Sequence, residues 1–97
     1  MKLALCQIAM SDNENENLER QLSALRQAAL HGADLIVYPE LQLHRFFPQY
    51  EGRDVSDKLL TADHPIIRQF QDACRENRIM AAPNFYLREP SGCFEAT

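Results

Sequence analysis

The sequence is poor in lysine, and no run of basic residues occurs along its 97 positions. Lys2 and Lys58 are its only lysines, and acidic residues outnumber basic ones to give a net charge of −4 and a pI of about 5.2. Proteins that bind nucleic acid neutralise phosphates with clustered Lys and Arg. The charge pattern therefore excludes nucleic acid as a partner.

Cysteine is scarce and odd in number, with Cys6, Cys74 and Cys93 in the whole chain. There is no Cys-x-x-Cys pair and no histidine at metal-ligand spacing, so we predict neither a disulfide framework nor a zinc site. Cys6 falls in an apolar run and Cys74 on the apolar side of a predicted helix, whereas Cys93 falls in a predicted turn. A reactive cysteine needs an electropositive pocket or a nearby base, which the sequence around these three does not supply. We predict structural roles for all of them.

Long hydrophobic runs are also missing. The apolar runs, such as residues 35–38, are far shorter than the ~18 residues that a membrane span needs. The first seven residues are too broken for a signal peptide and lack a cleavage site, so they predict a strand. With 45% hydrophobic and 25% charged residues, the composition is that of a globular protein, and we expect it to be cytoplasmic.

Two amphipathic helices are predicted. The first covers residues 13–31, begins at a capping box formed by Ser11 with Glu14 or by Asn13 with Glu16, and ends before Gly32. Its apolar stripe has the spacing i, i+4, i+7 and i+11, while other residues of the helix lie off it. The stripe consists of Leu18, Leu22, Leu25 and Ala29, and the residues off it are Glu19, Arg20, Gln21 and Arg26. The second helix has Asp63 as its cap and Pro65 in its first turn, and ends at Asn77.

Three strands are predicted between and around the helices. Residues 2–9 predict a strand covered on both faces, followed by strands at 34–38 and 79–82, the last of which residues 84–87 can continue. We expect a turn over residues 88–93 and the start of another strand at 94–97. Residues 41–63 predict mainly a loop with a helical turn near 56–60. The order β-α-β-loop-α-β predicts an α/β fold.

Two polar residues follow predicted strands, where open α/β sheets carry their functional groups. Glu40 comes two residues after the strand at 34–38, and Asn84 comes after the strand at 79–82. A carboxylate at the end of an apolar strand loses part of its hydration, which raises its pKa towards that of a useful general base. The alternative is a solvated loop glutamate without a chemical role.

Several motifs follow one another in a fixed order: the opening strand Lys2-Leu3-Ala4-Leu5-Cys6-Gln7, the run Gly32-Ala33-Asp34-Leu35-Ile36-Val37-Tyr38-Pro39-Glu40-Leu41, and the later segments 78–86 and 93–97. Together they resemble the N-terminal part of the nitrilase superfamily of carbon–nitrogen hydrolases. The resemblance spans essentially the whole chain. It implies that residues 1–97 are the N-terminal portion of a single domain, the β-α-β-loop-α-β part of an α-β-β-α sandwich.

The resemblance also implies a mechanism based on a Glu-Lys-Cys triad, without a metal or organic cofactor. Glu40 matches the glutamate that acts as general base, whereas the lysine and cysteine match no position here. The substrates implied are small amides, N-carbamoyl compounds or nitriles, and segment 46–51 is similar to that of enzymes acting on N-carbamoyl amines or amino acids. Phe46 and Phe47 either line the substrate pocket or only cover the core. Family members commonly form homo-oligomers.

A different class of function remains open: a small non-catalytic α/β binding or interaction module. It is favoured by the missing lysine and cysteine, and by a chain that could be complete. A flavodoxin-like phosphate binder ranks last, because no glycine-rich loop follows the first strand. Since the chain ends where a fourth strand begins, we expect it to be a fragment that is inactive alone and whose bare sheet face would recruit a partner.

Overall fold

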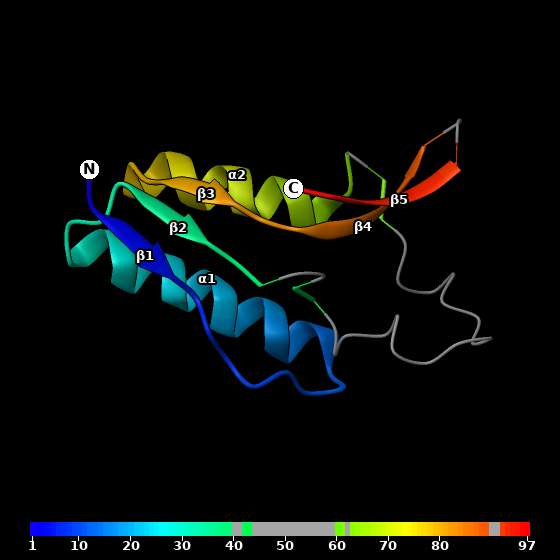
Figure 1. The fold of residues 1–97 in the computed structure, drawn as a ribbon, viewed down its shortest axis with the longest axis horizontal. Helices are drawn as coiled ribbons and strands as arrows, with labels where there is room; N and C mark the ends of the chain where they lie inside the picture. The colour runs from blue at the N-terminus through cyan, green and yellow to red at the C-terminus, as the bar shows by residue number, and fades with distance from the viewer. Residues whose placement is uncertain (40–41, 44–59, 62, 90–91) are drawn as a thin grey trace.

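The computed structural model describes residues 1–39, 42–43, 60–61, 63–89 and 92–97. Its elements are β1 (Leu3–Leu5), α1 (Glu14–Leu30), β2 (Leu35–Val37), α2 (Pro65–Asn77), β3 (Met80–Ala82), β4 (Phe85–Glu89) and β5 (Gly92–Ala96) (Figure 1). Strands β1, β2 and β3 form a parallel sheet in that order, and β4 pairs with β5 in a second, antiparallel sheet. The predicted α/β class is confirmed.

Helix α1 begins at the second of the two predicted capping boxes. The Asn13 side chain accepts a hydrogen bond from the backbone N–H of Glu16 at 3.1 Å. Gly32 follows the C-cap with a φ of +81°, a conformation that glycine adopts without steric cost. Leu18, Leu22 and Leu25 are buried as the stripe predicts. Neither α1 nor α2 is long and apolar enough to cross a membrane, and the same holds for all residues that the structure describes.

Helix α2 has a different cap from the one predicted. His64, and not Asp63, is the N-cap, and its Nδ1 accepts from the backbone N–H of Ile66 at 3.1 Å. The Asp63 carboxylate is occupied elsewhere, because a hydrogen bond with the Thr61 side chain stabilises its charged form and lowers its pKa. The helix ends at Asn77, as predicted, and Arg78 takes the left-handed conformation with a φ of 53°.

Replacing Arg78 with glycine is expected to stabilise the protein. A side chain in the left-handed region costs about 1–2 kcal/mol, part of which glycine regains despite its freer unfolded state. We expect the free energy of unfolding to rise by about 0.5–1 kcal/mol in denaturant titration. Arg75→Gly is the matched control: it lies inside α2, where glycine should destabilise by about 1 kcal/mol. A loss of stability in both variants would contradict this account.

The parallel sheet has one face against both helices and one face without them (Figure 1). Ala4, Ile36 and Ala81 form one register row, and they pack into the core that the two helices provide. The neighbouring rows, which point the opposite way, contain only apolar side chains: Leu3, Leu35, Met80, Leu5, Val37 and Ala82. Figure 1 shows α1 and α2 side by side behind the strands, and the two helices pack against each other.

The first strand differs from its prediction in length and in burial. It covers three residues, not residues 2–9, and Leu3 and Leu5 are 55% and 68% exposed. The prediction of cover on both faces was therefore wrong for these residues. The reason is that α1 and α2 lie on the same side of the sheet, so the side chains that point away from them stay accessible.

The C-terminal part of the chain forms a hairpin, which the sequence only partly predicted. Cys93 lies in β5 opposite Arg88 of β4, so the expected turn at residues 88–93 is wrong at both of its ends. Leu60 joins the other edge of β4: its N–H donates to the Tyr86 carbonyl at 2.9 Å, and its carbonyl accepts from the Arg88 N–H at 2.7 Å. The helical turn expected before Leu60 falls outside the described residues.

Candidate active site

The carboxyl ends of β1, β2 and β3 meet at one edge of the parallel sheet. Beyond the strands the pairing continues, because the Cys6 N–H donates to the Val37 carbonyl at 2.8 Å and the Tyr38 N–H donates to the Ala82 carbonyl at 3.3 Å. Tyr38, Pro39 and Asn84 therefore leave the sheet at the same edge. This is the edge at which parallel α/β sheets carry their functional groups.

Tyr38 fixes the chain where it leaves β2. Its side chain is buried, and its hydroxyl donates to the backbone carbonyl of Gln21 in α1 at 2.8 Å. The ring meets Phe70 of α2 edge-on, with centroids 5.3 Å apart. Burial raises the pKa of Tyr38 far above its ordinary value, so its hydroxyl stays protonated and continues to donate.

Gln42 is held at four atoms by two partners. Its backbone N–H donates to the Asn84 carbonyl at 3.1 Å, and its side-chain oxygen accepts from the Asn84 N–H at 2.7 Å. Its side-chain amide donates to the Gln21 side-chain oxygen at 2.7 Å, while the Gln21 amide donates back to the Gln42 carbonyl. Gln21 and Gln42 are both fully buried. The result ties one short segment to α1 and to the end of β3.

Asn17 holds the next residue of the same segment. Its buried side-chain amide donates to the carbonyls of Leu43 and Ser11, each at 2.8 Å, and its oxygen accepts from the Ser11 N–H at 2.9 Å. Leaving one such buried group without a partner costs about 1–3 kcal/mol. We refer to the side chains of Asn17, Gln21 and Gln42 as the amide cluster.

The amide cluster was missed in the sequence, where Gln21 was assigned to the polar side of its helix. A signal was present: Asn17 and Gln21 have the spacing i, i+4 and each directly precedes a leucine of the apolar stripe. Polar residues that repeat with the same spacing as the apolar stripe, each one position before a stripe leucine, lie at the edge of the buried side of the helix. What the spacing could not reveal is the partner, because Gln42 lies 21 positions further along the chain.

The residues predicted for catalysis and substrate binding, Glu40, Phe46 and Phe47, lie outside the described residues. The structure does describe Tyr38 and Pro39 before Glu40, and Gln42 and Leu43 after Leu41. Asn84, the other predicted candidate, is buried, and its side-chain amide donates to the Thr97 hydroxyl at 2.7 Å. Its backbone supports Gln42, so it contributes to holding this segment.

Lys2 is placed at the wrong end of the sheet to assist a group after β2. It precedes β1, its N–H donates to the Asp34 carboxylate at 2.7 Å, and its ammonium group donates to the His31 carbonyl. These contacts are at the amino ends of the strands. Lys58 lies outside the described residues.

The described thiols are packed as predicted. Cys6 is buried and Cys74 is partly buried against the core. Desolvation raises the pKa of both thiols above the ordinary value, which keeps them protonated and poorly nucleophilic at neutral pH. Among the described residues, no group of three or more His, Cys, Asp or Glu side chains is placed to hold a metal ion.

Thiol labelling is expected to show this protection directly. In a 97-residue chain carrying Cys93→Ser, Cys6 and Cys74 should react with a thiol reagent at least about tenfold more slowly in buffer than in denaturant, because the native thiols are desolvated. The same burial predicts a pH dependence. Because the thiols ionise at lower pH in the unfolded chain than in the folded one, the free energy of unfolding should fall as the pH rises above the unfolded pKa and through the folded pKa. Equal labelling rates in buffer and denaturant would contradict the burial of these side chains.

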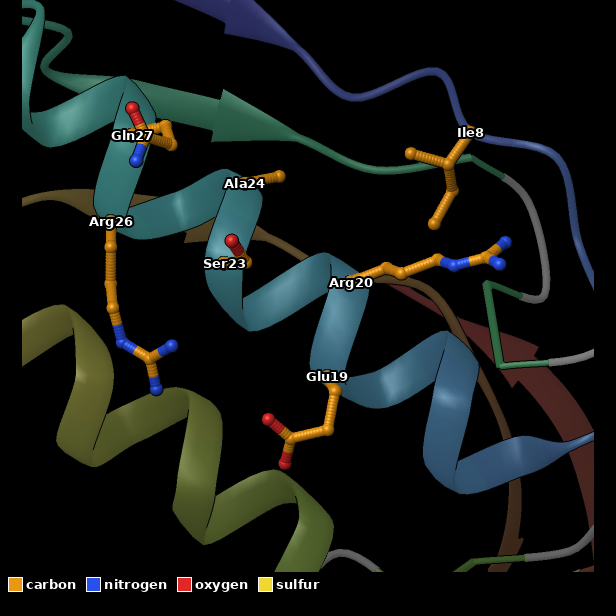
Figure 2. A pocket seen from close by; sticks show the side chains of 7 residues that line it. All are labelled: Ile8, Glu19, Arg20, Ser23, Ala24, Arg26 and Gln27. Carbon is orange, nitrogen blue, oxygen red and sulfur yellow. The ribbon is translucent and has the colours of Figure 1, made fainter.

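A groove also lies beside α1. Figure 2 shows Ile8 and Arg20 on one side of the helix, whereas Glu19 and Arg26 point to the other side, towards α2. Arg20 already donates to the Ala9 carbonyl at 3.0 Å and pairs with Glu16. Because its charged groups diverge, the groove does not form a binding site.

Comparison with known proteins agrees with the resemblance in the motifs. The family model for carbon–nitrogen hydrolases matches residues 2–93. A protein named citrullinase from Francisella tularensis subsp. tularensis is 30% identical over 97 residues, which is 99% of this chain and 34% of that protein. The chain thus spans about a third of the length of this curated relative. Since the family model covers nearly all of the sequence, the chain belongs to the carbon–nitrogen hydrolase family.

Proposed function

We propose that the protein hydrolyses a non-peptide carbon–nitrogen bond of a small amide or N-carbamoyl compound, with Glu40 as the general base. The observation that carries the proposal is the family match over residues 2–93, which includes the Pro39-Glu40 pair, separated from the end of β2 by Tyr38. Residues 1–97 are then the N-terminal portion of one hydrolase domain. The resemblance to the family implies that a lysine and a cysteine farther along the full-length protein complete the triad. Among the described residues, Lys2 donates to the His31 carbonyl, and Cys6 and Cys74 pack in or against the core.

The reaction would proceed in two halves. Glu40 takes the proton of the cysteine thiol, and the thiolate attacks the carbonyl carbon while the lysine stabilises the oxyanion. The carbon–nitrogen bond breaks as Glu40 returns the proton to the leaving nitrogen. A simple amide leaves ammonia and a thioester on the enzyme, whereas an N-carbamoyl compound leaves an amine and an S-carbamoyl cysteine, whose hydrolysis gives carbamic acid that decomposes to carbon dioxide and ammonia. Water then gives a proton to Glu40 and attacks the thioester, and the thiol recovers its proton as the acid product leaves.

An N-carbamoyl substrate is the class we favour. The name of the Francisella relative, citrullinase, points to citrulline, whose side chain ends in a carbamoyl group on nitrogen. Phe46 and Phe47, a few residues after Glu40, would line the pocket beside the carbamoyl group. From the family relationship we also propose that the protein is a cytoplasmic homo-oligomer. Size-exclusion chromatography of the full-length protein would test the oligomeric state.

Ammonia release from a panel of substrates tests this function. The full-length protein should release ammonia from citrulline or another N-carbamoyl amine faster than from a simple nitrile with the same carbon skeleton. Faster release from the nitrile would overturn the substrate class. No release of ammonia from any amide, carbamoyl compound or nitrile would overturn the proposed activity itself.

A further inference from the structure

We propose that the amide cluster is a positioning device for the base, which holds the chain at Tyr38 and at Gln42 and Leu43, on either side of Glu40, at the carboxyl edge of the sheet. The inference rests on the proposed function, because it assigns these amides a task only if Glu40 is the base. Asn17, Gln21 and Gln42 act through the backbone and do not touch the substrate. They are positioning residues and not catalytic ones.

Two held points of the chain lie on either side of Glu40. Tyr38 is bound to Ala82 and to Gln21, and Gln42 is bound to Gln21 and Asn84. Only three residues, at positions 39–41, separate them, and one is a proline with a fixed φ. The two held ends are thus close along the chain, and the proposed base belongs to the three residues that join them.

Both held points are tied to the same residue of α1. The Gln21 carbonyl accepts from the Tyr38 hydroxyl at 2.8 Å, while the Gln21 side chain pairs with Gln42 through two hydrogen bonds. One helical residue therefore sets the separation of the two ends. Asn17, one turn earlier in α1, adds a bond to the Leu43 carbonyl at 2.8 Å.

Amide side chains suit this task because they are neutral. An amide both donates and accepts, so two glutamines satisfy each other and a backbone group without any charge. A buried arginine or lysine would hold a backbone carbonyl equally well, but it would lower the pKa of a carboxylate nearby and weaken it as a base. A neutral cluster fixes the segment without this effect.

Kinetics of the full-length protein with Gln21→Met or Gln42→Met test the inference. Methionine keeps the length and volume of the side chain but cannot form these hydrogen bonds. We expect kcat to fall by about 10- to 100-fold, as small displacements of a catalytic group do, with KM for the N-carbamoyl substrate within about threefold. Gln27→Met is the matched control, because Gln27 is an exposed residue of the same helix, and its kcat should stay within about twofold of the unmodified protein.

Circular dichroism at the assay temperature shows whether each variant is folded, and kcat is referred to folded protein. If a methionine variant does not fold, Asn17→Ala provides the test, since it removes the tie to Leu43 and leaves the pair of glutamines intact. Folded variants with unchanged kcat, or with a change in KM alone, would overturn the inference. Glu40→Gln in the same assay separates the two proposals: normal turnover there refutes the base, whereas an inactive Glu40→Gln protein beside fully active amide variants refutes only the positioning role.

Discussion

Glutamine in place of Glu40 is expected to reduce turnover of the full-length protein by roughly 10³- to 10⁴-fold. The side chain keeps its size and its acceptor oxygen, but it can no longer take the proton of the cysteine thiol or return it to the leaving nitrogen. Both halves of the proposed reaction use this proton transfer, so both should slow. Ammonia release under saturating substrate measures the effect.

Glu19→Gln is the control for this prediction. Glu19 is an exposed residue of α1, so the same change of charge should leave turnover within about twofold. Far-ultraviolet circular dichroism should show the same helix content in both variants. Turnover of the Glu40→Gln protein near that of the control would assign the base to another group.

The second large effect concerns the 97-residue chain by itself, which is expected to hydrolyse none of these substrates above the rate in buffer. The loss of the nucleophile alone costs many orders of magnitude in this kind of mechanism. Cys6 and Cys74 cannot replace it, because burial raises the pKa of both thiols. Lys2 lies at the opposite end of the sheet.

A folded sample is needed for this result to count, and helix content by circular dichroism provides that check. The full-length protein in the same buffer is the positive control. Hydrolysis by the 97-residue chain that disappears on Cys6→Ala, Cys74→Ala or Cys93→Ala would show that one of these cysteines is the nucleophile and would overturn the proposed triad.

Local signals in the sequence were enough to predict both helices and the order β-α-β-loop-α-β of the elements along the chain. Asn13 and Gly32 mark the ends of α1, and the apolar stripe selects its buried side. Each of these features acts within a few residues of the chain, which is why it can be read without a structure. The cap of α2 was assigned one residue too early, because Asp63 is a good cap by type but bonds to Thr61 instead.

Features that depend on distant partners could not be predicted in the same way. The sequence shows Gln21 only as a polar residue beside the apolar stripe. Its buried position depends on hydrogen bonds with Gln42, which lies 21 positions further along the chain. Leu3 and Leu5 fit a strand covered on both faces, and their exposure follows only from the placement of both helices on one side. Glu40 was identified by its position after a strand and by its match to a family motif, and its role stays a proposal.

The most direct test of the central claim is intact-protein mass spectrometry of the full-length protein, quenched shortly after mixing with an N-carbamoyl substrate. If Glu40 activates a cysteine, the unmodified protein gains the mass of a carbamoyl group in a bond that hydroxylamine cleaves, as it cleaves thioesters. The Glu40→Gln protein, folded and at the same concentration, should show no such adduct on this timescale. Formation of the adduct at the same rate in both proteins would contradict the assignment of Glu40 as the general base.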